Sequence, residues 1–188
     1  GKINENKIIF KNLINLSSNK CMFTHSVHSG KIQSFKNNEN KLLISVNSSG
    51  WSDNASMASL ETDSICGKIL LVDVNSKSYE IYSKGHRNII GLYSDKDVVL
   101  STEHGPFSGD EINNIKYKKS YGWPVASYGE KYSRGNSNDD PFYKKNHKIN
   151  GFEEPIFSFI PALGISEIIK LSNNFSEMWE DNFLIASL

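Results

Sequence analysis

The sequence has no apolar run long enough to cross a bilayer as a helix. Its longest apolar candidates are residues 68–74 and 98–100, whereas a membrane-spanning helix needs roughly 18 to 20 residues. We therefore expect no membrane-spanning segment.

An excess of one charge is also missing. The 21 Lys and Arg residues balance 21 Asp and Glu residues and are interspersed with them. Nucleic-acid binders and polybasic membrane patches carry a basic surface. We therefore expect no nucleic-acid partner, and a neutral or weakly charged small molecule fits the composition better.

Cysteine is scarce, with Cys21 and Cys66 as the only two. One disulfide and two buried thiols are both compatible with this count, and neither residue has zinc-ligand spacing around it. The chain starts at Gly1 without a methionine and stops at Leu188 inside an apolar run, so we expect that it is cut at both ends. The absence of a signal peptide then says nothing about location.

A sustained apolar period of 3.6 residues is absent as well, which excludes a helical bundle. Short β-rich runs recur instead, separated by turns rich in Asn, Asp and Ser, and this pattern predicts an all-β sandwich, barrel or propeller. The expected strands are residues 7–10, 31–35, 41–46, 68–74, 78–82, 98–101, 167–171 and 182–186.

The segment 120–151 differs in kind, because it is rich in Gly, Ser, Asn, Asp, Tyr and Lys and has little apolar alternation. We interpret it as a long surface loop. Loops of this length in a compact domain are usually functional or disordered, so a lid or rim element and a disordered insertion are both open.

Four sequence blocks occur in a distinctive order. They are Gly67-Lys-Ile-Leu, Gly85-His-Arg-Asn-Ile-Ile-Gly-Leu, Ser101-Thr-Glu-His-Gly-Pro-Phe-Ser-Gly-Asp-Glu-Ile-Asn and Tyr121-Gly-Trp-Pro. Together they resemble the soluble quinoprotein glucose/sorbosone and aldose sugar dehydrogenase family. Two later blocks, at 159–165 and 178–188, are similar to the family's later blade motifs.

The resemblance implies a six-bladed β-propeller built from four-stranded antiparallel sheets. Residues 1–188 would then be a single partial propeller domain that supplies middle blades. It also implies pyrroloquinoline quinone (PQQ) on the central axis, calcium, hydride transfer from an aldose sugar and a periplasmic or extracellular location. The electron acceptor that reoxidises the quinone is unknown.

By resemblance, Arg87 and Asn88 bind the quinone. A guanidinium stays charged and stabilises negative charge that develops on a quinone oxygen. The alternative is that Arg87 is a structural ion-pair partner. The family usually has Gln where this chain has Ile90, which removes one hydrogen bond.

The resemblance also implies two calcium positions. At the first, the backbone carbonyls of Gly105 and Pro106 bind a calcium that bridges to the quinone, and a hard cation prefers such oxygen ligands. The alternative is a simple tight turn. At the second, Glu111 binds through its carboxylate and Tyr121 through its carbonyl, unless Glu111 is only a solvated residue at a strand end.

The general base is the least preserved position. The family has His three residues before a Gly-Arg pair, and here Val27 stands three residues before Gly30. His28 is therefore our candidate for the catalytic base, since His suits proton abstraction near neutral pH. The family's Asp that orients the base corresponds to Asn47, which cannot stabilise an imidazolium as a carboxylate does.

The remaining polar residues fit less specific roles. His86 and His104 are expected to hold loops, and His147 belongs to no metal-binding motif. Trp51, Trp123 and Trp179 can stack on a sugar or pack inside a blade. Because Val27, Asn47 and Ile90 depart from the pattern, a non-catalytic propeller that binds carbohydrate or protein is the second hypothesis. A nicotinamide dehydrogenase is excluded by the lack of a Gly-rich strand-to-helix turn.

Overall fold

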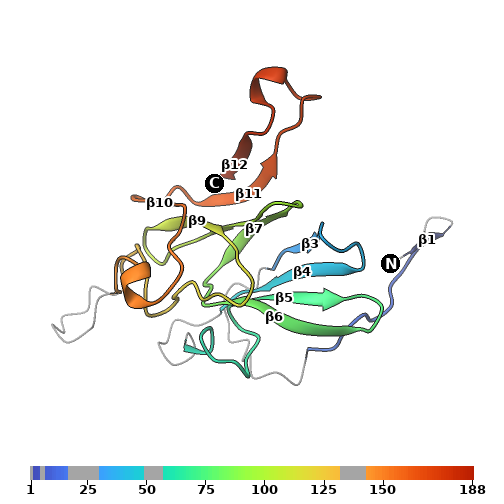
Figure 1. The fold of residues 1–188 in the computed structure, drawn as a ribbon, viewed down its shortest axis with the longest axis horizontal. Helices are drawn as coiled ribbons and strands as arrows, with labels where there is room; N and C mark the ends of the chain where they lie inside the picture. The colour runs from blue at the N-terminus through green and yellow to red at the C-terminus, as the bar shows by residue number, and fades with distance from the viewer. Residues whose placement is uncertain (1, 5–6, 17–29, 49–56, 132–142) are drawn as a thin grey trace.

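The computed structural model describes residues 2–4, 7–16, 30–48, 57–131 and 143–188. Within them the fold is nearly all β, with two single-turn 3-10 helices, and the expected all-β class is confirmed (Figure 1). The strands are β1 Lys2–Asn4, β2 Lys7–Ile9, β3 Ile32–Ser34, β4 Lys41–Val46, β5 Lys68–Asp73, β6 Ser78–Lys84, β7 Ile89–Ser94, β8 Val99–Glu103, β9 Asp110–Asn114, β10 Phe157–Phe159, β11 Ile165–Lys170 and β12 Phe183–Ser187, and the 3-10 helices are η1 Lys148–Asn150 and η2 Glu177–Trp179.

Two antiparallel four-stranded sheets dominate the structure, as the propeller hypothesis expects. The first has the order β3-β4-β5-β6 and the second β10-β9-β8-β7, so each is a meander of consecutive strands. The hairpins β1-β2 and β11-β12 form separate two-stranded sheets. Figure 1 shows β11 lying next to β7, the first strand of the second sheet.

Strand β5 is buried on both faces, because its sequence is a continuous apolar run. Ile69 and Leu71 join a core cluster that continues into the second sheet through Ile89 and Leu92. The alternate residues, Leu70 and Val72, belong to a separate cluster on the opposite face. Side chains of successive strand residues point to opposite faces, so this one strand serves both cores.

Lys68 begins β5 and is fully buried. Its ammonium donates hydrogen bonds to the carbonyls of Ala58, Ser59 and Cys66 at 2.8 to 2.9 Å. Burial lowers its pKa to about 7. Cys66 is itself buried and disulfide-bonded, and Cys21 lies outside the described residues.

The contact between β7 and β11 depends on Gly91. A Cβ atom at this position would lie 2.4 Å from Thr102 Oγ1, 2.7 Å from the Ser166 carbonyl oxygen and 2.9 Å from the Ile168 nitrogen. Two of these neighbours are backbone atoms, which cannot rotate away. Glycine at this position therefore lets the β11-β12 hairpin approach the second four-stranded sheet.

The strands expected from apolar runs are all present, with boundaries shifted by a few residues. Sequence reasoning missed β1, β7, β9 and β10. β9 has the polar sequence Asp-Glu-Ile-Asn-Asn, β10 has only three residues, and Gly91 interrupts the apolar alternation of β7. In segment 120–151 the described parts are irregular apart from η1, yet Tyr121, Trp123 and His147 are buried. The role of this segment as a lid or rim stays a prediction.

Candidate functional site

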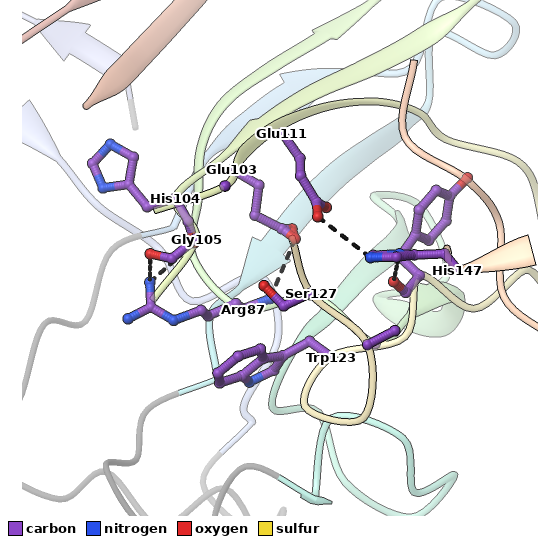
Figure 2. A pocket seen from close by; sticks show the side chains of 12 residues that line it. Arg87, Glu103, His104, Gly105, Glu111, Trp123, Ser127 and His147 are labelled. Carbon is purple, nitrogen blue, oxygen red and sulfur yellow. Dashed lines mark hydrogen bonds and ion pairs between the residues drawn. The ribbon is translucent and has the colours of Figure 1, made fainter. Parts of the chain in front are cut away.

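A small pocket lies where three connections meet at one end of the second sheet. It is lined by the β6–β7 connection, by the turn between β8 and β9 and by the segment that follows β9. Figure 2 shows Arg87, Glu103, Gly105, Glu111, Trp123 and His147 around it. Its volume of about 10 Å³ gives room for about one water-sized group.

Arg87 connects the predicted quinone site with the predicted calcium turn. Its Nη1 atom donates to the carbonyls of His104 at 2.9 Å and Gly105 at 2.8 Å. The guanidinium also lies over the Trp123 ring, with 5.4 Å between its central carbon and the ring centroid, which is a cation–π contact. The structure thus brings together three residues that the sequence analysis named separately.

Asn88 accepts a hydrogen bond from the side chain of Asn47. The backbone N–H of Ile89 donates to Asn47 Oδ1 at 2.9 Å, which fixes the orientation of the Asn47 amide. Its Nδ2 atom then donates to Asn88 Oδ1 at 2.6 Å. Asn47 therefore positions a predicted quinone ligand, a role that sequence reasoning missed. His28 and Val27 lie outside the described residues, so the assignment of His28 as base stays a prediction.

The Gly105-Pro106 turn is anchored by the buried carboxylate of Asp110. Asp110 accepts hydrogen bonds from the backbone N–H groups of Gly105 at 3.1 Å, Gly164 at 2.8 Å and Ile165 at 3.2 Å. A Cβ atom on Gly105 would lie 1.9 Å from the Ser108 carbonyl oxygen, so only glycine fits. Asp110 thus ties the turn to the start of β11.

Glu111 and Tyr121, the second predicted cation pair, both contact His147. Nδ1 of His147 donates to the Tyr121 carbonyl at 3.0 Å, and Nε2 lies 3.5 Å from Glu111 Oε1 (Figure 2). Glu111 is 8% exposed, so it is not a solvated residue at a strand end. Burial, and then the charge of Glu103, raise the pKa of Glu111 well above its ordinary value. Burial lowers the pKa of His147.

Beside this pair, His86 and Glu103 form a second buried contact. His86 Nδ1 lies 3.3 Å from Glu103 Oε2, and its Nε2 lies 2.8 Å from Ser83 Oγ. The His86 ring stacks on Tyr121 with 4.8 Å between the centroids. His104 contacts the Ile165 carbonyl through Nε2 at 2.6 Å. His86 and His104 are thus bound within loops and between sheets, as we expected.

Two features of the pocket suit an acceptor-rich ligand. The indole N–H of Trp123 is buried and has no hydrogen-bond partner among the described residues, and the Arg87 guanidinium lies against that ring. Buried donors are normally paired, so an unpaired one next to a positive charge matches oxygen acceptors of a ligand. In the described part of the chain no group of three or more His, Cys, Asp or Glu residues has a metal-binding arrangement.

The family model and two of the curated relatives that match this chain name sugar dehydrogenases. A family model described as glucose / sorbosone dehydrogenase matches residues 1–188. The aldose sugar dehydrogenase YliI of Escherichia coli (strain K12) is 31% identical over 111 residues, which are 58% of this chain and 29% of that protein. The chain therefore spans less than a third of this curated relative.

Solved structures agree with the sequence relatives. A crystal structure of a glucose dehydrogenase matches 84% of this chain and 47% of its own chain, with a TM-score of 0.69 and 26% identity. The PQQ-bound form of an aldose sugar dehydrogenase from Streptomyces coelicolor matches 76% of this chain and 39% of its own, with a TM-score of 0.54 and 26% identity. The chain thus spans about half or less of these structures.

Proposed function

Because the chain belongs to the glucose/sorbosone dehydrogenase family, we propose that it is part of a PQQ-dependent enzyme that oxidises an aldose sugar. The observation that carries this proposal is the contact of Arg87 with Trp123 and with the Gly105 turn. The resemblance assigns Arg87 to the quinone and Gly105 to calcium, so their contact supports the proposal. A relative is PQQ-bound, which supports the choice of cofactor.

The residues present fit a quinone in part. Arg87 supplies positive charge for oxygen atoms of the cofactor, and the unpaired Trp123 N–H supplies a hydrogen-bond donor. Asn88 is the second proposed contact and is held in place by Asn47. The pocket takes about one water-sized group, so it is too small to enclose a tricyclic quinone.

The carbonyls of Gly105 and Pro106 are the proposed calcium ligands. The Gly105 carbonyl accepts a hydrogen bond from Arg87 and, since a carbonyl oxygen has two lone pairs, it can still bind a cation. Two positive groups on one carbonyl repel each other. An anionic cofactor that contacts both groups offsets this repulsion, so calcium and the quinone are expected to bind together.

Held by Arg87 and Asn88, the quinone would supply the two-electron acceptor for the hydride at C1 of the sugar, which would leave the sugar as a lactone. The chain's own task is to take the proton of the C1 hydroxyl, and we assign it to His28. Arg87 stabilises the negative charge that develops on the cofactor oxygen.

A periplasmic or extracellular location belongs to the same proposal. Structural disulfides persist mainly in oxidising compartments, and Cys66 is disulfide-bonded. No helix in the described ranges has the length and apolar character needed to span a membrane. The proposed partners are a small sugar and an electron acceptor of unknown identity.

A non-catalytic propeller that binds carbohydrate or protein is the second candidate. Asn47 favours it, because the amide that stands in place of the family's Asp is engaged with Asn88 and Ile89. Neutral Asn also lacks the charge that would stabilise a protonated base. Ile90 removes a further polar contact at the quinone side.

The test uses the full-length protein, titrated with PQQ with and without calcium and assayed for dye reduction with a panel of aldoses. The enzyme proposal expects calcium-dependent PQQ binding and sugar-driven dye reduction that His28→Ala abolishes. Lys36→Ala, at an exposed position, serves as the control. Absence of PQQ binding well above micromolar concentrations would leave the non-catalytic propeller.

A further inference from the structure

His147 is fixed in position from several sides. The residue is 1% exposed, and its ring stacks parallel on Tyr128 with 5.3 Å between centroids and 7° between planes. Its carbonyl accepts hydrogen bonds from the backbone N–H groups of Asn150 and Phe152, both at 3.0 Å. The imidazole is therefore a fixed part of the pocket wall.

The two ring nitrogens of His147 face different partners. Nδ1 donates to the Tyr121 carbonyl at 3.0 Å, and Nε2 faces Glu111 Oε1 at 3.5 Å (Figure 2). The Nε2–Glu111 distance is within ion-pair range, but the contact does not have hydrogen-bond geometry. Nε2 thus has no hydrogen-bond partner among the described residues. The ring thus lies between the carbonyl and the carboxylate.

A calcium ion needs oxygen ligands that converge on one point at about 2.3 to 2.6 Å. The imidazole stands between the Glu111 carboxylate and the Tyr121 carbonyl, so a cation cannot contact both while the ring is in place. We propose that the His147 side chain takes the place of a cation between Glu111 and Tyr121, so that this position is held together without metal.

The neighbouring contacts support a permanent histidine rather than one side-chain conformation among several. The Lys148 backbone N–H donates to Glu154 Oε2 at 2.9 Å, and the Asn150 side chain donates to the carbonyls of Lys145 and Asn146. These bonds fix the chain on both sides of His147. Moving the ring out to admit calcium would break its hydrogen bond to the Tyr121 carbonyl and its stacking on Tyr128.

The first experiment is metal analysis of the full-length wild-type protein, crystallised with calcium and examined by anomalous diffraction. The expected result is no cation peak between Glu111 and the Tyr121 carbonyl, with the imidazole density in its place. A cation that is bound there, or a transition metal on His147 Nε2, would overturn the inference. This measurement needs no variant to fold.

The second experiment compares His147→Ala with Lys148→Ala, an exposed neighbour whose substitution keeps the backbone contact. After chelation and dialysis into calcium, His147→Ala is expected to bind one more calcium per chain than wild type and Lys148→Ala. Its lowered Tm should rise again with calcium or with imidazole. The double variant His147→Ala/Glu111→Gln should lose the extra calcium.

A folded His147→Ala protein that neither gains calcium nor responds to imidazole would contradict the inference. The result does not depend on the proposed sugar oxidation, because neither PQQ nor sugar is present in these measurements. Calcium at the Gly105 turn is common to all the proteins and cancels in the comparison.

Discussion

Arg87 Nη1 and the Gly105 carbonyl, 18 positions apart in the chain, are joined by a hydrogen bond of 2.8 Å. This bond makes the predicted quinone ligand and the predicted calcium turn a single unit. A change at Arg87 should therefore alter both affinities. The guanidinium donates to both carbonyls through Nη1 while its plane lies over the Trp123 ring, and a shorter, non-planar ammonium cannot keep both kinds of contact.

Arg87→Lys is expected to weaken PQQ binding by at least about tenfold, which corresponds to about 1.4 kcal/mol. The dependence of PQQ binding on calcium should also weaken, because the Gly105 turn loses its hydrogen bond from the Arg87 side chain. Absorbance titration of the full-length protein measures both effects, with Lys36→Ala as control. Equal dissociation constants in Arg87→Lys and wild type would argue against a role for the guanidinium.

Asn47→Ala removes the acceptor for the Ile89 N–H and the donor to Asn88. A buried unpaired N–H costs about 1 to 3 kcal/mol, and the free energy of unfolding measured by urea denaturation should fall by this amount. Asn47→Asp keeps the acceptor for Ile89 but cannot donate to Asn88. It should therefore lose less stability than Asn47→Ala, and the opposite order would contradict the assigned contacts.

Asp110→Ala leaves three backbone N–H groups without their acceptor. We expect a loss of about 3 kcal/mol in the free energy of unfolding. Asp110→Asn keeps an acceptor oxygen and should lose less. The check is the urea midpoint of both variants, and a midpoint within error of wild type for Asp110→Ala would show that other groups anchor the turn.

Gly91→Ala places a methyl group against backbone atoms of β11. Overpacking of this kind typically costs about 1 to 3 kcal/mol, and here Ser166 and Ile168 cannot rotate away. Thermal unfolding should show a lower Tm for the variant. An unchanged Tm would mean that β11 moves away from β7 freely.

The lowered pKa of Asp95 makes the stability of the protein depend on pH in the acid range. Hydrogen bonds from the Val98 backbone N–H, and then from other donors that include Asp97 and Tyr93, outweigh desolvation and lower its pKa. A lowered folded-state pKa gives stability that is present above the ordinary Asp pKa of about 3.9 and is lost as pH falls through the folded value. Asp95→Asn should therefore flatten the decline of Tm below about pH 4. An identical decline in wild type and Asp95→Asn would contradict this.

Local sequence patterns predicted the strands that are built from apolar runs and the residues that lie in the ordered blocks. The apolar run 68–74 predicted β5, and the ordered blocks singled out Arg87 and Gly105, whose mutual contact only the structure shows. Sequence reasoning missed β9, because polar residues form that strand. The contacts of Asn47 with Asn88 and of His147 with Glu111 join residues 41 and 36 positions apart, and no local periodicity reports such pairs.

The connection between the third and fourth strands differs greatly between the two four-stranded sheets. In the first sheet it consists of residues 74–77, whereas in the second it spans residues 115–156 and carries Tyr121, Trp123 and His147. Both of its ends lie on adjacent antiparallel strands, so its length can change without moving the sheet. Substitutions and insertions in this connection can therefore change one wall of the pocket without a shift in the register of β9 and β10.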